Sequence, residues 1–254
     1  MGYLRLIYRL PLFLLHVLVG TPITVLCQTR FGDAVKIGSR TASEITSVWW
    51  SSTVCRIFGL RIRARGAILP GTQLVVANHI SWLDIPLLHS QSSLGFVSKA
   101  EIADWPVIGF LAKSGKTVFH KRGSHDSASG VAAVMAERLQ QGGKVAIFPE
   151  GGILPGPGVK RFHGRLFAAA IETGSPVQPV MLRYLRRGAH DHRMTFLPGE
   201  HFVGNFFRLM RQKRCIAEVV ILPRLDPRGK QRRQLAAEAE QAVRAAFDAD
   251  LADG

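Results

Sequence analysis

A histidine and an aspartate lie five residues apart in the segment NHISWLD, residues 78–84. On a continuous helix their side chains would point roughly 140° apart, because five residues turn through about 500°. The pair can meet only if His79 precedes a helix and Asp84 lies in its first turn. Asp84 could then accept a hydrogen bond from one ring nitrogen, leaving the other to remove a proton from a hydroxyl. The alternative is a helix capped at Ser81-x-x-Asp84, with His79 an ordinary loop residue.

A second loop, FPEGG at residues 148–152, combines a carboxylate with two glycines. Pro149 fixes a turn, Glu150 offers an acceptor for a substrate hydroxyl, and the glycines leave backbone N–H groups open to an anion. A plain Pro-Gly turn is the alternative interpretation. Each loop directly follows a short apolar run, TQLVVA at 72–77 or KVAIF at 144–148, which predicts a buried strand. Chemistry in open α/β sheets collects at the carboxyl ends of strands, so both loops are places to look for a site.

Short apolar runs alternate with helical spacing from about residue 58 onward. This pattern predicts a layered α/β fold with a largely parallel sheet flanked by helices. Strands are expected at 72–77, 94–98, 116–120, 144–148, 177–182 and 216–222. Helices are expected at 82–90, 105–113, 127–141, 162–173 and 231–251. We expect one α/β domain at residues 58–254, preceded by a membrane-associated helical region at 1–57.

The composition fits a folded chain that meets a polyanion. Of 254 residues, 47% are apolar and 20% charged, which excludes a disordered polyelectrolyte. The excess of 33 Lys and Arg over 18 Asp and Glu gives a net charge of +15. Such an excess points to nucleic acid, an anionic membrane or phosphorylated substrates. The three widely spaced cysteines, Cys27, Cys55 and Cys215, exclude a disulfide framework and a zinc knuckle and fit a reducing compartment.

Residues 10–29 form a run of twenty residues without a formal charge. That is about the length of a membrane span, roughly 20 residues, but Pro11, Gly20 and Pro22 interrupt it. No A-x-A-like site follows, which argues against a cleaved signal peptide. Basic residues flank the run on both sides, so we expect a helical hairpin lying in an anionic surface rather than spanning it. The expected location is the cytoplasmic face of the inner membrane; an apolar helix packed on the domain is the alternative.

The two loops, in this order, resemble the glycerolipid acyltransferases, the lysophosphatidic acid acyltransferase-like group. NHISWLD is similar to that family's N-H-x4-D block and FPEGG to its F-P-E-G block. Between and after them, VFHKR at 118–122 is similar to the strand-then-arginine block and VQPV at 177–180 to the closing V-x-P-V. The resemblance spans about residues 70–182. One departure is that the family continues F-P-E-G-T-R-S, whereas this chain reads FPEGGILPGPGVKRF.

The resemblance implies an O-acyltransferase that moves a fatty acyl chain from acyl-CoA or acyl-acyl carrier protein to the free hydroxyl of 1-acyl-glycerol-3-phosphate, giving phosphatidic acid. His79 is then the general base and Asp84 its orienting partner, with no acyl-enzyme intermediate. Arg122 would hold the acceptor's phosphate, and Glu150 with Gly151 would position its glycerol end. No metal and no bound cofactor are expected. The residues expected to bind substrate are Asn78, Lys99, Arg122, Glu150 and Gly151.

The altered FPEGG loop keeps another acceptor open, such as a lyso-ornithine lipid or a lysophospholipid. Nucleic-acid binding is the rival class, because residues 183–233 carry thirteen Lys and Arg against four acids. No nucleic-acid module or interleaved stacking aromatics accompany that charge, so we assign it to anionic lipid or an acidic acyl carrier protein. A catalytically inactive scaffold would have no use for His79, Asp84, Arg122 and Glu150 together. We interpret the segment HDH at 190–192 as a solvated loop rather than a metal site.

Overall fold

The computed structural model describes residues 2–99, 118–120, 125–153 and 158–249. In this part of the chain the main sheet has eight strands, in the order β3-β10-β8-β4-β7-β5-β6, with β9 paired to β8. These strands are β3 (Leu60–Arg65), β4 (Gln73–Ala77), β5 (Gly95–Lys99), β6 (Val118–His120), β7 (Lys144–Ile147), β8 (Val177–Arg186), β9 (Ala189–His190) and β10 (Cys215–Ile221). All neighbours along this order pair in parallel except β10 and β8. The expected largely parallel α/β sheet is confirmed.

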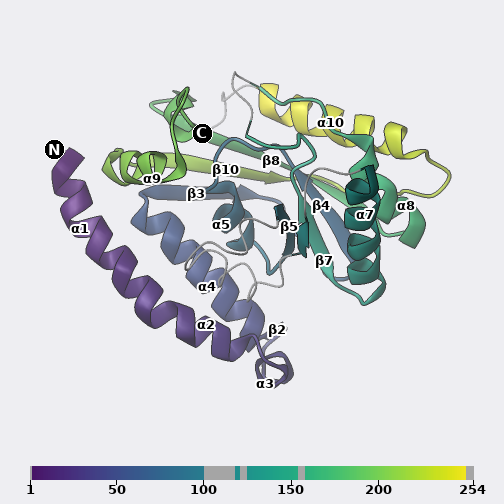
Figure 1. Ribbon diagram of the computed structural model, residues 1–254, viewed down its shortest axis with the longest axis horizontal. Coiled ribbons are helices and arrows are strands. Elements are labelled where there is room, and N and C mark those ends of the chain that lie inside the picture. The colour runs from purple at the N-terminus through teal and green to yellow at the C-terminus, as the bar shows by residue number, and fades with distance from the viewer. Residues whose placement is uncertain (1, 100–117, 121–124, 154–157, 250–254) are drawn as a thin grey trace.

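Helices cover both faces of the sheet (Figure 1). They are α4 (Ala42–Ile57), α5 (Asp84–His89), α7 (His125–Gln140), α8 (Ala168–Thr173), α9 (Phe202–Arg211) and α10 (Arg232–Asp248), with the short turns η3 (Gly164–Phe167) and η4 (His192–Met194). The helix expected at 105–113 lies outside the described residues. Neighbouring residues of β4 face opposite sides: Val75 packs with α4, α5 and α9, and Leu74 with α7, α8 and α10. This alternation is why β4 is buried along its whole length.

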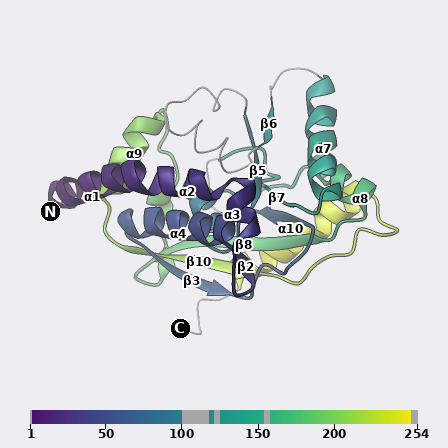
Figure 2. The ribbon, with the colours of Figure 1, turned by 90° about the horizontal axis from the view of Figure 1, so that it is seen from below.

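The N-terminal region forms a long helix that turns back along α4. A single helix runs over Gly2–Cys27 as α1 (Gly2–Leu15), the π-helical turn η1 (His16–Gly20) and α2 (Thr21–Cys27). The short helix α3 (Arg30–Ala34) and the two-stranded hairpin of β1 (Lys36–Ile37) and β2 (Arg40–Thr41) lead into α4. Figure 2 shows α1 and α2 as one rod beside α4, with which both are in contact. The predicted helical hairpin is therefore present.

The long helix has its apolar side chains on the outside. Its inward stripe contains Arg9, His16 and Thr21, all buried, together with Leu6 and Phe13 against the core. The exposed large apolar side chains of this helix are Tyr3, Leu4, Ile7, Tyr8, Leu12, Leu14, Leu15, Leu18, Val19, Ile23 and Leu26. An apolar surface this extended is typical of membrane contact. The helix is also long and apolar enough to cross a bilayer, with a mean hydropathy of 2.1 in its best window.

Several basic residues that we assigned to the membrane flank or to a partner surface have other roles. Arg9 is only 2% exposed and donates from Nη1 to the carbonyls of Met210 (3.0 Å) and Gln212 (2.8 Å). Arg183 is likewise buried and donates from Nη2 and Nε to one oxygen of Glu218, at 2.6 and 2.9 Å. These interpretations were wrong because their partners lie in distant segments of sequence.

A further group of basic residues lies on β3, at the edge of the sheet. Arg61, Arg63 and Arg65 alternate with apolar residues along β3, a strand that we did not predict. In the described residues β3 pairs only with β10, so it is an edge strand. Charged side chains on an edge strand discourage pairing with another chain. These arginines therefore have a role that does not depend on a membrane.

Candidate active site

The loop after β4 brings His79 and Asp84 together. Asp84 is the first residue of α5, His79 lies just outside the helix, and His79 Nδ1 is 2.9 Å from Asp84 Oδ2. The chain therefore folds back as the spacing required. The Ser81 hydroxyl oxygen accepts from the Leu83 N–H at 3.4 Å, and Asp84 accepts from the Ser81 N–H at 2.9 Å, so Asp84 closes the first turn as well as contacting His79.

Asp84 is completely buried, and both of its carboxylate oxygens accept hydrogen bonds. Its Oδ2 also accepts from the backbone N–H groups of Ile80 (2.6 Å) and Ser81 (2.9 Å). Its Oδ1 accepts from the Tyr184 hydroxyl at 2.7 Å. Burial, followed by the Asp84 charge, raises the pKa of Tyr184, so that the phenol remains a donor. Four donors on one buried side chain fix the orientation of the carboxylate towards His79.

This geometry determines the tautomer of His79. A carboxylate oxygen accepts, so the hydrogen shared with Asp84 is on Nδ1. The neutral ring then carries its lone pair on Nε2. The imidazole also stacks on Phe148, with ring centroids 3.8 Å apart and the planes 8° from parallel. Phe148 stacks in turn near Phe96, at 5.8 Å. The hydrogen bond to Asp84 and the stacking on Phe148 together fix the orientation of the His79 ring, as a general base requires.

Glu150 ties the second loop to the first. One of its oxygens accepts from the backbone N–H of His79 at 3.1 Å, and the other from that of Lys160 at 2.9 Å. Burial raises the pKa of Glu150, and these two hydrogen bonds oppose part of that effect. The carboxylate thus positions the backbone at His79 and closes the loop that follows FPEGG. Gly151 takes a left-handed backbone with φ of 83°, which the turn requires.

A cavity of about 340 Å³ opens beside these groups. One side of it is formed by His79, Glu150 and Tyr184, which places the imidazole at the wall of a space large enough for part of a substrate. The other lining residues come from the loop after β4, from the segment at 158–160, from β9 and the segment that follows it, and from the end of α10. They are Ile80, Gly158, Lys160, His190, Asp191, His192, Thr195, Phe247 and Asp248.

We also expected Asn78, Lys99 and Arg122 to bind substrate. Asn78 uses both ends of its amide on the backbone of Leu182, at 2.9 and 2.8 Å, so it brackets β4 to β8 instead of facing the cavity. Lys99 ends β5, at the same sheet edge as the two loops, and pairs in register with His120. Arg122 lies outside the described residues.

Sequence reasoning missed Tyr184 and Phe148 and misjudged the β8–β9 hairpin. Tyr184 shares a face of β8 with Val180 and Leu182, so alternation along a buried strand could have identified an inward phenol. The expected solvated loop at 190–192 is right for the exposed His190 and His192 but wrong for Asp191, which is buried and paired with Arg193. No group of three or more His, Cys, Asp or Glu in the described chain could hold a metal ion.

Comparisons with known proteins identify the family to which the chain belongs. The family model described as Acyltransferase matches residues 61–183. A lyso-ornithine lipid O-acyltransferase of Pseudomonas aeruginosa is 39% identical over 78% of this chain and 77% of its own length. A 1-acyl-sn-glycerol-3-phosphate acyltransferase of Neisseria gonorrhoeae is 32% identical over 76% and 77%.

A solved structure has the same fold. The 1-acyl-sn-glycerophosphate (LPA) acyltransferase PlsC of Thermotoga maritima matches with a TM-score of 0.69 over 97% of this chain and 94% of that one, at 19% sequence identity. The agreement therefore includes the N-terminal helices as well as the sheet. With relatives of this similarity matched over more than three quarters of their length, the chain belongs to the glycerolipid acyltransferase family and is an O-acyltransferase of the lysophospholipid type.

Proposed function

We propose that this enzyme acylates the free hydroxyl of a lyso-ornithine lipid, using an acyl thioester as donor. The observation that carries this choice is similarity: a second lyso-ornithine lipid O-acyltransferase, from Rhodobacter capsulatus, is 38% identical over 75% of this chain and 73% of its own length. These two relatives exceed the 32% identity of the 1-acyl-sn-glycerol-3-phosphate acyltransferase from Neisseria gonorrhoeae.

The geometry supports direct transfer. Nε2 of His79 takes the proton of the acceptor hydroxyl as its oxygen attacks the thioester carbonyl. The imidazolium that forms donates through Nδ1 to Asp84, whose charge stabilises it. Collapse of the tetrahedral intermediate breaks the carbon–sulfur bond, and the thiolate leaves with the proton held on Nε2. The products are one ester and one free thiol.

The cavity favours a head group that carries both signs of charge. Lys160 lies on its wall, and so do two acids, Asp248 and Asp191, the second of which is paired with Arg193. Ornithine combines an amine with a carboxyl group and has no phosphate. A phosphate bears only negative charge and would lie beside the same acids. After FPEG the chain continues with Gly-Ile-Leu where the family has T-R-S, so the threonine, arginine and serine that could bind a phosphate are missing at those positions.

Lysophosphatidic acid, the acceptor implied by the sequence blocks, is the second candidate. The arginine block at 118–122 favours it, because a guanidinium suits a phosphate, and so does the name of the relative from Neisseria gonorrhoeae. The two acceptors are separated by measuring kcat/KM for the purified chain with lyso-ornithine lipid, lysophosphatidic acid and lysophosphatidylethanolamine. Each acceptor is offered with acyl-CoA and with acyl-acyl carrier protein, and products are identified by mass. We expect preference for lyso-ornithine lipid; turnover of lysophosphatidic acid alone contradicts the proposal.

The thioester donor also indicates where the enzyme works. Acyl-CoA and acyl-acyl carrier protein are cytoplasmic thioesters, and the described cysteines are all free thiols, as in a reducing compartment. The apolar outer face of the helix Gly2–Cys27 supports attachment to a membrane. We therefore place the enzyme on the cytoplasmic face of the inner membrane, where it meets both a soluble donor and a lipid acceptor.

Replacing Tyr184 by phenylalanine should lower kcat about 10-fold and leave the acceptor KM unchanged. The variant removes the hydroxyl that donates to Asp84 at 2.7 Å and leaves that oxygen buried. Hydrogen bonds to charged groups contribute about 1.5–3 kcal/mol, and about 1.4 kcal/mol in the barrier is tenfold in rate. Steady-state kinetics in detergent measures both constants.

A double variant separates positioning from general damage to the fold. Tyr184→Phe acts through Asp84, so it should cost little further rate when Asp84 is already asparagine. The control is Tyr3→Phe, which makes the same chemical change on the exposed face of α1. An equal loss from Tyr184→Phe in both backgrounds would show that Tyr184 does not work through the carboxylate.

A further inference from the structure

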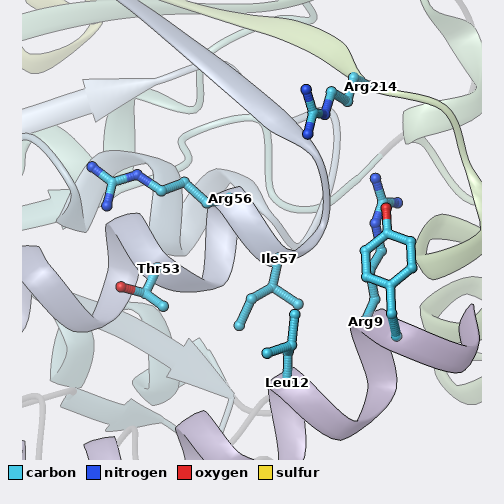
Figure 3. A pocket seen from close by; sticks show the side chains of 7 residues that line it. Arg9, Leu12, Thr53, Arg56, Ile57 and Arg214 are labelled. Carbon is cyan, nitrogen blue, oxygen red and sulfur yellow. The ribbon is translucent and has the colours of Figure 1, made fainter. Parts of the chain in front are cut away.

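A second cavity, of about 210 Å³, lies between α1, α4 and the loop after α9. It shares no lining residue with the cavity at His79. Figure 3 shows it from close by, with Arg9 and Leu12 projecting from α1, Arg56 and Ile57 from α4, and Arg214 from the loop. Tyr8 and Thr53 complete the lining.

The charge in this cavity has one sign. Three of its seven lining residues are arginines and none is an acid. Arg56 and Arg214 are exposed, and no hydrogen bond or ion pair within the described chain holds either side chain. Burial lowers the pKa of Arg9, the neighbouring Tyr8 opposes that effect, and the positive charges of Arg5 and Arg214 lower the pKa further. In Figure 3 the Arg9 side chain extends towards the part of the cavity where Arg214 lies.

The fold makes room for this arrangement. Gly59 takes φ of 83°, and a Cβ at that position would come within 2.2 Å of Arg9 Nη2. A side chain there would therefore displace the guanidinium from the carbonyls of Met210 and Gln212. Arg9 is thus fixed at the base of the cavity, while Arg56 and Arg214 at its rim remain available to a ligand.

The surroundings identify the chemical class of that ligand. Tyr8 and Leu12 line the cavity and are also half-exposed members of the apolar outer face of α1. A cluster of cations directly beside an apolar surface matches a molecule with a phosphate next to acyl chains. A nucleic acid or a phosphopeptide would have no use for the apolar part.

We propose that this cavity binds the phosphate group of a membrane phospholipid, separately from the acceptor that is acylated at His79. The phosphate would lie beside Arg214 and above the buried Arg9, with its acyl chains along α1, and the exposed Arg56, whose side chain extends away from Arg214 in Figure 3, would turn towards it. Occupation of the cavity would fix α1 at a set depth in the membrane surface and favour bilayers rich in such lipids.

Flotation of the full chain with vesicles tests the site. The vesicles are digalactosyldiacylglycerol, which has no phosphate, made anionic with either phosphatidylglycerol or an equal charge of palmitate. Removing two arginines near a surface should weaken binding by about 30-fold, so Arg56→Gln/Arg214→Gln should lose that much on phosphatidylglycerol vesicles. The matched control is Lys36→Gln/Arg40→Gln, which removes the same charge from the exposed β1–β2 hairpin of the same region.

Two results would overturn the proposal: an equal loss in both double variants, or equal wild-type binding to phosphatidylglycerol and palmitate vesicles. A solution measurement identifies the source of the phosphate. Dihexanoyl-phosphatidylglycerol should raise the unfolding temperature of the wild type but not of the arginine variant. If inorganic phosphate raises it equally, the cavity recognises the phosphate group alone; if neither compound acts, the site does not exist. Acyl transfer in detergent should be unchanged in the arginine variant, because neither residue lines the cavity at His79.

Discussion

Replacement of His79 by alanine is expected to lower the rate of acyl transfer by about 10²–10⁴-fold, the usual contribution of a general base. The imidazole is the group that the structure holds most firmly at the cavity wall, by the hydrogen bond to Asp84 and the stacking on Phe148. Its loss leaves the acceptor hydroxyl without a base but does not remove the walls that bind the acceptor. The acceptor KM should therefore change far less than kcat, which steady-state kinetics on the purified variant will show.

His201→Ala is the matched control for this experiment. His201 is an exposed histidine that precedes α9, and it does not line the cavity. Its replacement should leave the rate within about twofold of the wild type, since surface substitutions usually change stability by less than about 0.5 kcal/mol. A His79→Ala variant that kept more than a few per cent of wild-type turnover would remove His79 from the role of base.

Asp84→Asn should be nearly as damaging, with a loss of roughly 10²–10⁴-fold in kcat. The amide has nearly the shape of the carboxylate but no charge to stabilise the imidazolium, and its NH₂ group would face donors. Oδ2 alone accepts from His79, Ile80 and Ser81, so both backbone hydrogen bonds must break if the amide nitrogen, which cannot accept, takes that place. If it takes the other place, it meets the Tyr184 hydroxyl.

The same substitution should also destabilise the fold, because a buried group left without its partner costs about 1–3 kcal/mol. Thermal unfolding compares it with Asp226→Asn, which breaks an exposed ion pair to Arg228 and should cost less than about 1 kcal/mol. Activity close to the wild type in Asp84→Asn would mean that the carboxylate serves only to start α5.

Much of the sheet could be predicted because its strands are buried on both faces. The segments expected at 72–77, 144–148 and 216–222 contain β4, β7 and β10 to within one or two residues. Continuous apolar runs ending in glycine or proline are the clearest sequence signal that a parallel sheet gives. The strand β3 was missed because its alternating arginines resemble a charged linker when the partner β10 is unknown.

The site was predictable where its contacts are local. His79 and Asp84 are five residues apart, and one turn of chain determines whether they can meet. Tyr184 lies 100 residues from Asp84 along the chain, so its hydrogen bond depends on the pairing of β4 with β8. Glu150 was expected to bind substrate, but its contacts to the backbone at His79 and Lys160 could only be found once β4 and β7 were placed side by side.

The roles of the basic residues were harder still to predict, because their partners are also distant in sequence. Net charge indicates that a chain meets anions, but it does not say which arginine faces them. Arg183 forms a buried ion pair with Glu218 on the neighbouring strand, and Arg208 holds Glu200 and the carbonyl of Thr195. Arg56 and Arg214, in contrast, are neighbours of one cavity only because α1, α4 and the loop after α9 converge. From their positions in the sequence alone, the arginines that form internal contacts could not be distinguished from those that line the cavity.

The central claim is that His79 activates an acceptor hydroxyl for direct attack on an acyl thioester. The most direct test measures free thiol and ester together, in one time course with lyso-ornithine lipid, for the wild type and His79→Ala. We predict that the wild type releases one thiol for each ester formed and almost none without acceptor, and that His79→Ala forms ester about 10²–10⁴-fold more slowly. Ester formation at the wild-type rate by His79→Ala, or a stoichiometric burst of thiol from the wild type before acceptor is added, would contradict the account.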